Sequence, residues 1–433
     1  MTILDDVRAL LAEGPLCDAC LGRVFAERSH GLTNAERGRS LRVTLALVED
    51  EPFDPFAARD ASCWVCEGLC GDPGEWADRA AAAIGDVELE TYQVGTRVPP
   101  LIDENDRLLR EAAGLSPDVG EAFKSECNRE VGRRLGRQLG AEVDFERPDV
   151  LVLLDLATET VEVQVNSAFV YGRYRKLERD IPQTEWPCRE CDGRGTTRGA
   201  PCEHCDGTGY LYEHSVEGYV APHVEAAMDG AEAVFHGAGR EDVDARMLGD
   251  GRPFVVEVKE PRRRFPDLTE LERTIDDAAD GAVEVRDLAF ATHDMVERVK
   301  ELPASKTYRA TVEFDESVEQ AAFDAALRSL DGATIEQDTP DRVAHRRAAK
   351  TRIRTVYAAD GTLEDPTHAV VEVHGEGGLY VKELISGDAG RTRPSLADEL
   401  DVGATVTALD VLAVAGEEEP FTDPAFLREP LEA

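Results

Sequence analysis

The stretch FHGAGREDVDARMLGDGRPFVVEVKE, residues 235–260, decides how this chain of 433 residues is interpreted. Within it, a turn made of Gly239, Arg240, Glu241 and Asp242 leads through a polar segment into a strand rich in β-branched residues. Such a turn can hold a carboxylate at the floor of a cleft, with the arginine nearby as its electrostatic partner. Because an aspartate between charged residues is most often a solvated loop carboxylate, the turn needs support from elsewhere in the chain.

Three further segments give that support. In KTYRATVEF, residues 306–314, Lys306 and an aromatic residue stand at the start of a predicted strand. The segment GLYVKELISGDAGRTRPSLADEL, residues 378–400, is expected to join a strand, Lys382, a glycine-rich turn and a helix. The segment TPDRVAHRRAAKTRIR, residues 339–354, contains six Lys or Arg residues and one acid, and such a basic island favours contact with phosphate.

The overall charge is strongly acidic. Asp and Glu number 88 against 48 Lys and Arg, which gives a formal net charge of −40. An acidic protein can avoid nucleic acid because phosphate repels it, or it can belong to a salty cell whose whole proteome is acidic. We favour the halophilic interpretation, because the acidic residues are spread along the chain. In molar salt the Debye length is about 3 Å, so the net charge hardly forbids contact with RNA.

Composition also limits the class of protein. Hydrophobic residues make up 42% of the chain, and its length predicts two or three globular domains. The chain has no apolar run of membrane-spanning length, and its first residues lack the layout of a signal peptide, so we expect a soluble, cytoplasmic protein and, by default, a monomer. In that compartment ten cysteines indicate metal sites or reactive thiols rather than disulfides.

Two copies of CxxCxGxG, at 188–195 and 202–209, predict a structural Zn²⁺ site. Each copy places two thiolates on a tight turn, and four sulfur ligands satisfy the tetrahedral preference of zinc. The predicted ligands are Cys188, Cys191, Cys202 and Cys205. The alternatives are a knuckle that no longer holds metal, a redox pair, or a binding protein without catalysis, because the doubled motif resembles the zinc region of Hsp40 chaperones. No HPD-bearing helical hairpin accompanies it, and Hsp40 proteins carry four copies.

Two CxxC pairs near the N-terminus predict a second zinc site, closed by a longer loop. Its expected ligands are Cys17, Cys20, Cys63 and Cys66. Cys70 is a spare thiol that can substitute for Cys66, and the alternative is a set of buried apolar cysteines. Neither set looks catalytic, since a catalytic zinc keeps an open position and commonly uses His or carboxylate ligands.

The turn and its supporting segments resemble the motifs of the pseudouridine synthase superfamily. The first motif, G-R-x-D, is matched at 239–242 and the second, K-x-Y-x-A, at 306–310. A third, an apolar residue followed by Lys or Arg, is matched by Val381 and Lys382. Together with the N-terminal CxxC pairs and the segment DVLVLLDL…VYGRYRK, these motifs make nearly the whole chain similar to the archaeal and eukaryotic tRNA pseudouridine-54/55 synthase family. VYGRYRK is similar to the end of a THUMP-type RNA-binding domain.

The resemblance implies isomerisation of uridine to pseudouridine at positions 54 and/or 55 of the tRNA T-loop, without an organic cofactor. The base must first be everted from the loop. Asp242 would then be the nucleophile, at the ring or at the ribose; its rival is Asp244, which would point to the opposite side of an extended segment. Tyr308 would stack on the base and take part in proton transfer, and Lys382 would keep the nucleophile ionised and aimed. The other residues expected around the substrate are Arg240, Val381 and Leu409, the last as a wall of the pocket.

The implied partner is the T-arm of tRNA, held by three basic patches. The patches comprise Arg173, Arg175, Lys176 and Arg179; Arg262, Arg263 and Arg264; and Arg342, Arg346 and Arg347. Each can instead be an ion-pair face, which the surplus of acid favours. Two other functions compete: a catalytically inactive THUMP-type tRNA-binding accessory protein, and another THUMP enzyme such as a methyltransferase or thiolation enzyme. The latter needs a cofactor site, and the sequence has neither a convincing dinucleotide-binding turn nor a phosphate loop.

The predicted fold class is α+β, with four segments. These are an N-terminal zinc-binding segment (1–78), a THUMP-type α/β RNA-binding module (79–187), the zinc-knuckle insert (188–213) and a catalytic domain (214–433). The catalytic domain should contain a mixed, mainly antiparallel sheet with a central cleft. We expect the knuckle at the junction of the two halves, where it would set their relative orientation.

Overall fold

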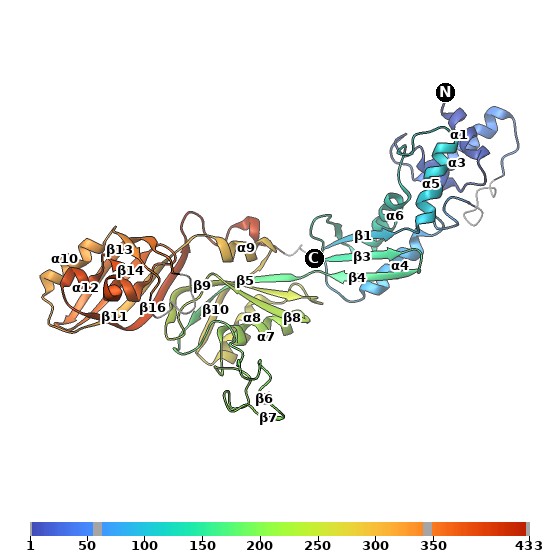
Figure 1. Cartoon of the computed structure of the whole chain (residues 1–433). Helices are drawn as coiled ribbons and strands as arrows, with labels where there is room; N and C mark the ends of the chain where they lie inside the picture. The colour runs from blue at the N-terminus through green and yellow to red at the C-terminus, as the bar shows by residue number, and fades with distance from the viewer. Residues whose placement is uncertain (1, 55–62, 341–348, 430–433) are drawn as a thin grey trace. The chain divides into compact units, whose positions relative to one another are not determined.

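The computed structural model describes residues 2–54, 63–340 and 349–429. It divides into two compact units, Met1–Asn166 and Ser167–Ala433, which we call unit 1 and unit 2 (Figure 1). Each unit has its own sheet and its own buried core, so the mixed helix-and-strand fold class is as predicted. None of the helices in the described parts of the chain is both long and apolar enough to cross a membrane.

Unit 1 packs helices against a four-stranded sheet of order β2–β1–β3–β4. The strands are β1 (Thr91–Arg97), β2 (Glu142–Val143), β3 (Val150–Asp155) and β4 (Thr160–Val165). The helices are α1 (Ile3–Ala12), α2 (Asp18–Arg23), α3 (Asn34–Glu49), α4 (Pro73–Ile84), α5 (Pro100–Ala112) and α6 (Phe123–Leu139). Strand β1 pairs in parallel with β2 and β3, whereas β3 and β4 are antiparallel. The strand predicted in PDVLVLLDL is β3, and its alternate residues face the core.

Helices α2 and α3 of unit 1 cross where each carries a glycine. A Cβ atom at Gly22 would lie 1.9 Å from the carbonyl oxygen of Asn34, and a Cβ atom at Gly38 would lie 1.9 Å from that of Asp18. No side chain fits between the two backbones at this crossing. Because Cys17 caps α2 and Cys20 lies within it, the crossing also fixes the N-terminal cysteine pair.

Unit 2 is built on a ten-stranded sheet in which β10–β5–β9–β16–β11–β14–β13–β12–β15 are neighbours and β8 pairs with β9. The long strands are β5 (Ala168–Lys176), β8 (Glu232–Gly237), β9 (Arg246–Lys259), β10 (Val283–Ala291), β11 (Ala304–Phe314), β13 (Arg352–Asp365), β14 (His368–Gly375) and β16 (Ala404–Gly416). The short strands are β12 (Thr334–Gln337) and β15 (Thr392–Arg393), and a separate hairpin of β6 (Thr196–Thr197) and β7 (Ala200–Pro201) lies in the zinc-knuckle insert. All pairings in the large sheet are antiparallel except the short β9–β16 contact, which agrees with the predicted sheet type.

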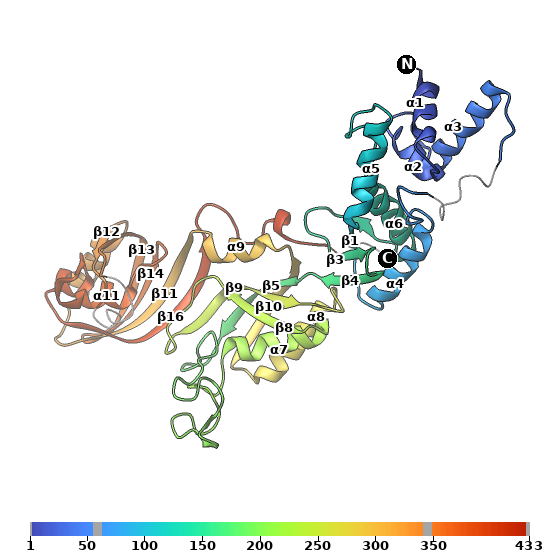
Figure 2. The same cartoon turned by 45° about the vertical axis from the view of Figure 1, so that its right-hand side comes forward.

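Helices cover this sheet at both of its ends. The helices are α7 (Val216–Met228), α8 (Leu268–Ala279), α9 (Asp294–Glu301), α10 (Gln320–Leu330), α11 (Val381–Ser386) and α12 (Leu396–Leu400). Figures 1 and 2 show α7 and α8 side by side against the part of the sheet formed by β8, β9 and β10, and α10 at the far end beside β13. The two ends have separate cores, and the middle strands β9, β16 and β11 join them.

Strand β5 differs from our expectation. We placed VYGRYRK in the RNA-binding module, but β5 pairs with β9 and β10 and belongs to the sheet of unit 2. The zinc-knuckle insert, which follows β5, lies within unit 2 for the same reason. A local pattern shows that a segment is a strand, but the partner is set by residues 70 or more positions away, such as Val256 opposite Val170.

A second difference concerns Lys382. The strand expected in GLYVK is a turn, and Lys382 is the second residue of the short helix α11. Val381, Leu384 and Ile385 of this helix are buried in the core. Their spacing of three and four residues is that of one helical face, which explains why the helix forms here.

The glycine crossing in unit 1 gives a testable prediction. We expect Gly38→Ala to separate α2 and α3 and to lower the free energy of unfolding by about 2 kcal/mol, as overpacking of a tight contact does. Thermal unfolding of the variant measures this. The matched control is Ser40→Ala, which lies on the exposed face of the same helix and should leave the transition unchanged. An unaltered melting curve for Gly38→Ala would contradict the close contact.

Candidate active site

The turn that carries Asp242 connects β8 to β9. The N–H of Ala245 donates to the carbonyl oxygen of Asp242 at 3.0 Å, so this segment is folded back on itself rather than extended. As a result Asp242 and Asp244 do not point to opposite sides, as an extended segment would require. Both reach Lys382, whose Nζ lies 3.5 Å from Oδ2 of Asp242 and 2.9 Å from Oδ2 of Asp244.

Tyr308 distinguishes the two carboxylates. Burial raises the pKa of Tyr308 to about 12; Arg252 opposes the shift, and the negative charges of Asp242 and Glu241 add to it. The phenol is therefore a neutral hydroxyl at any physiological pH. Asp242 thus lies beside the ammonium group and its charge acts on the phenol, and its side chain is 44% exposed against 61% for Asp244.

An apolar wall lies beside these groups. Val381 precedes Lys382 at the start of α11, and Leu409 on β16 is directly opposite Ala310 on β11. All three are buried in one core cluster, and Tyr308 packs against it. The structure therefore brings together the predicted Asp242, Tyr308, Lys382, Val381 and Leu409. Their roles in catalysis stay predictions.

Arg240 is arranged differently from our expectation. It is exposed on the turn, and within the described residues Asp242 pairs with Lys382 instead. The partner of the turn's other carboxylate, Glu241, is Arg252 on β9, at 2.8 Å. The sequence interpretation missed this pair, because Glu241 occupies the variable position of the motif.

Glu241 and its partners form a buried polar network beneath the turn. The side chains of Glu241 and Arg252 are each only 1% exposed. The hydroxyl of Tyr174 donates to the Glu241 carboxylate at 2.9 Å, and Nζ of Lys176 lies 3.7 Å from it. Burying an ion pair is costly unless its polar atoms are satisfied, and here a phenol and a second cation complete the set.

Lys176 also holds the backbone of the turn. Its Nζ donates to the carbonyl oxygens of Ile181 at 2.7 Å, Val243 at 3.1 Å and Asp242 at 3.4 Å. Because Lys176 is completely buried, our prediction that it belongs to an RNA-contacting patch is wrong. Burial lowers the pKa of this ammonium group, and the charge of Glu241 opposes the shift.

The arginines of the same patch are engaged within the protein, including Arg179, which pairs with Asp410 at 2.7 Å. Arg173 donates to the carbonyl oxygens of Asp250, Gly251 and Val414, and Arg175 pairs with Glu284 at 2.7 Å. In the second patch Arg264 is buried. Arg342, Arg346 and Arg347 of the third patch lie outside the described residues. Contact of these arginines with RNA stays a prediction.

The four thiols of the zinc-knuckle insert converge as predicted. The Sγ atoms of Cys188 and Cys202 are 3.9 Å apart, those of Cys191 and Cys205 are 3.8 Å apart, and all four lie within 4.8 Å of one another. This spacing suits four thiolates around one tetrahedral metal ion. All four side chains are buried.

The N-terminal cluster contains one more thiol than expected. The sulfurs of Cys17, Cys20, Cys66 and Cys70 lie within 4.8 Å of one another, so Cys70 joins Cys66 where we predicted Cys63, rather than substituting for Cys66. The thiol of Cys63 also interacts with those of Cys17, Cys20 and Cys66. Five thiols therefore lie close together, one more than a tetrahedral Zn²⁺ site would use.

A buried cation lies beside this cluster. Nη2 of Arg23 is 3.4 Å from Sγ of Cys20, and the guanidinium pairs with Asp106 and Glu126 at 2.8 Å each. Four thiolates around a divalent ion would leave a net negative charge, which this arginine partly offsets. The same guanidinium also ties α2 to α5 and α6.

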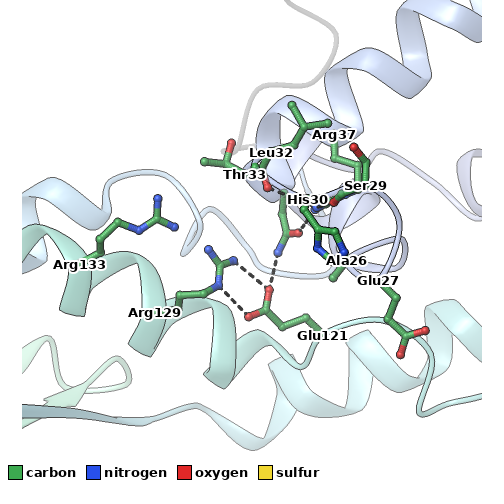
Figure 3. Close-up of a pocket in the computed structure, with 12 residues that line it drawn as sticks. Ala26, Glu27, Ser29, His30, Leu32, Thr33, Arg37, Glu121, Arg129 and Arg133 are labelled. Carbon is green, nitrogen blue, oxygen red and sulfur yellow. Dashed lines mark hydrogen bonds and ion pairs between the residues drawn. The ribbon is translucent and has the colours of Figure 1, made fainter. Parts of the chain in front are cut away.

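A pocket of about 470 Å³ in unit 1 is lined by several charged side chains (Figure 3). The carboxylate of Glu121 accepts hydrogen bonds from Arg129 at 2.9 Å and from Asn34 at 2.7 Å. Arg37 donates to backbone carbonyl oxygens of the surrounding loop. These contacts use much of the pocket's positive charge inside the unit, so the pocket does not by itself identify an anion site.

Comparison with known families fits this arrangement. Residues 169–415, more than half of the chain, match the family model described as Pus10, C-terminal, and residues 76–155 match Pus10 THUMP domain, archaeal. The fold and these matches define the class: the chain is a pseudouridine synthase, an isomerase. More particularly, it belongs to the Pus10 family.

Relatives of known name agree with this assignment. A tRNA pseudouridine synthase Pus10 of the halophile Halorubrum lacusprofundi is 62% identical over 99% of this chain and 100% of its own length. One of Methanothrix thermoacetophila is 45% identical over 94% of this chain and 93% of its own. The crystal structure of a Cbf5–Nop10–Gar1 complex is 18% identical with a TM-score of 0.29, covering 45% of this chain and 44% of that chain; a likeness this low carries no weight.

The network beneath the turn gives a second prediction. We expect Glu241→Gln to leave Arg252 and Lys176 charged, buried and uncompensated, and to lower the free energy of unfolding by about 3 kcal/mol or more. Scanning calorimetry in molar KCl measures this. Glu284→Gln is the matched control, because it breaks a pair that is much more exposed and should cost less than about 1 kcal/mol. Equal effects of the two substitutions would contradict the structural role of Glu241.

Proposed function

We propose that this protein converts uridine to pseudouridine at position 54, 55 or both in the T-loop of tRNA, with Asp242 as the nucleophile. One observation carries the proposal: Asp242 is the carboxylate of the motif turn that lies 3.5 Å from the Lys382 ammonium and whose charge acts on the Tyr308 phenol. The relatives' name, tRNA pseudouridine synthase, supports the substrate class.

The reaction needs an ionised carboxylate beside an apolar wall. The target uridine leaves the loop and enters the pocket, where Tyr308 and Leu409 contact its base. Asp242 attacks the ring or the ribose, and the bond from ribose C1′ to N1 breaks. After the base turns, C1′ bonds to C5 and the bond to Asp242 breaks, which frees the carboxylate. The proton leaves C5 and N1 takes up a proton, so the product is an isomer. Lys382 keeps Asp242 ionised, and no organic cofactor takes part.

Two Zn²⁺ ions are proposed to hold the cysteine clusters together. Thiolate sets of this geometry favour zinc, and a closed set of four ligands is structural rather than catalytic. The N-terminal cluster would stabilise unit 1, whose THUMP-type part we propose as a tRNA-binding module. The residues from β5 onward would form the catalytic domain, which acts as a monomer in the cytoplasm.

A catalytically inactive tRNA-binding accessory protein is the alternative function. Such a protein has no need of a carboxylate, an ammonium group and a buried phenol in one place, and the arrangement of Asp242, Lys382 and Tyr308 therefore favours the enzyme.

Substitution of the proposed nucleophile tests the function. We expect Asp242→Asn to lower the rate of pseudouridine formation in a tRNA transcript by on the order of 10³-fold or more, while its affinity for tRNA survives. Asp244→Asn is a close control, because Asp244 contacts the same Lys382 and is more exposed. Pseudouridine is mapped site by site in molar KCl. Normal turnover by Asp242→Asn, or an equal loss with Asp244→Asn, would refute the assignment.

Metal content tests the two cysteine clusters. Wild-type protein should contain two zinc ions per chain by mass spectrometry of the metal. We expect the double variant Cys188→Ser, Cys202→Ser to lose one ion and Cys17→Ser, Cys20→Ser to lose the other, since each set then lacks two thiolates. Cys127→Ser is the control and should keep both. Separate Cys63→Ser and Cys70→Ser variants then show which thiol completes the N-terminal set. Wild-type protein without zinc would contradict the assignment.

A further inference from the structure

A second pocket in unit 2 lies outside the proposed active site, with a volume of about 210 Å³. It lies where the chain segments on either side of the zinc-knuckle insert meet the first turn of α7. The residues that form its walls include Trp186, Tyr210, Tyr212, His214, Tyr219 and Glu185. Its volume is below the roughly 300–1,000 Å³ of sites for drug-sized ligands, so it suits a single planar ring system.

The walls are unusually aromatic for this chain, in which aromatic residues make up 6%. One of its three tryptophans and three of its nine tyrosines lie here. Trp186 and Tyr212 meet edge to face with centroids 5.5 Å apart, and His214 stacks on Tyr219 at 5.2 Å. The residues are only partly buried, so part of each ring remains accessible. Accessible aromatic faces are what unpaired bases of RNA stack upon.

The backbone around the pocket is preorganised. The N–H of Leu211 donates to the carbonyl oxygen of Trp186 at 2.9 Å, and Pro187 and Tyr210 form an antiparallel bridge. These contacts close the base of the insert, whose other end is held by the four-cysteine cluster. These backbone contacts explain why the aromatic rings lie close together, but they do not fill the pocket between the rings.

The charged groups at the pocket are carboxylates rather than cations. Glu185 is exposed, and its carboxylate lies close enough to the phenol of Tyr210 that its charge and a hydrogen bond raise the pKa of that phenol. Glu213 is also exposed at the rim. A carboxylate accepts hydrogen bonds and cannot donate them, so it selects ligands that present N–H groups.

The same segment is tied to the catalytic turn. Nε2 of Gln183 donates to the carbonyl oxygen of Gly239 at 2.8 Å, and the N–H of Asp180 donates to that of Val243 at 3.0 Å. The pocket therefore has a fixed relation to the turn that carries Asp242.

We propose that this pocket binds an unpaired guanine of the RNA substrate, stacked between its aromatic walls with its N1–H and N2–H groups donating to Glu185. The inference rests on the proposed function for the identity of the RNA. Guanine presents two adjacent donors that match the two oxygens of one carboxylate. Uracil presents one N–H between two carbonyl oxygens, which the carboxylate repels, so this pocket differs in specificity from the catalytic pocket.

Fluorescence of Trp186 tests the pocket without reference to catalysis. Wild-type protein is titrated with GMP and with UMP in molar KCl, and the signal is assigned by its loss in Trp186→Phe. We expect GMP to quench the fluorescence and to bind at least about tenfold more tightly than UMP. Glu185→Gln should remove this preference, whereas Glu203→Gln, an exposed carboxylate of the same insert, should keep it. An equal response to both nucleotides, or no response to millimolar GMP, would overturn the proposal.

Affinity for the whole tRNA transcript gives the second measurement. Tyr212→Ala should weaken binding at least about fivefold, because base stacking on an aromatic ring is lost. Tyr357→Ala, a partly exposed tyrosine of β13, is the matched control and should bind normally. The GMP response should persist in Asp242→Asn. If no pseudouridine forms while the GMP response remains, the proposed function fails and the pocket stands; unchanged tRNA affinity in Tyr212→Ala overturns the pocket alone.

Discussion

The buried ion pair between Glu241 and Arg252 is the interaction on which the position of the proposed nucleophile depends. Neither charge is accessible to water, so each would be strongly destabilising without the other. Arg252 belongs to β9, and Lys176, which binds the carbonyl oxygens of the same turn, belongs to β5. The turn that carries Asp242 is thereby fixed to two adjacent strands of the sheet, although its own residues form no regular structure.

Part of this arrangement could be predicted from the sequence. The resemblance implied that Asp242, Tyr308 and Lys382 share one site. Lys382 does lie 3.5 Å from Asp242, and the charge of Asp242 acts on Tyr308. The inward direction of Lys176 could not be predicted. Alternation along a strand separates a buried face from an exposed one, but both faces of β5 are covered. Nearly every residue of β5 is buried. From the sequence alone, a lysine within VYGRYRK is expected on the surface, and only the pairing with β9 and β10 shows that it is buried.

The cysteine clusters show the same limit at shorter range. In the CxxCxGxG repeats the spacing alone predicts which four thiols converge, since two tight turns lie 14 residues apart. In the N-terminal set the spacing predicts the pairs but not the complete set. Cys70 lies 3.8 Å from Cys20 because the chain turns after Cys66, and that turn has no signature in a CxxC motif.

The use of charge in this acidic protein bears on how it recognises RNA. The arginines of β5 bind carbonyl oxygens and carboxylates within the protein. They therefore stabilise the sheet rather than being available to phosphate. In molar salt, contacts with phosphate also weaken steeply. Releasing counterions from RNA then gains little entropy, because the surrounding solution is already concentrated in ions. Stacking on bases and hydrogen bonds to base edges lose much less of their binding free energy in high salt. They act at contact distance, where salt screens charges little. A protein with this composition gains more from aromatic pockets such as that around Trp186 than from additional basic patches.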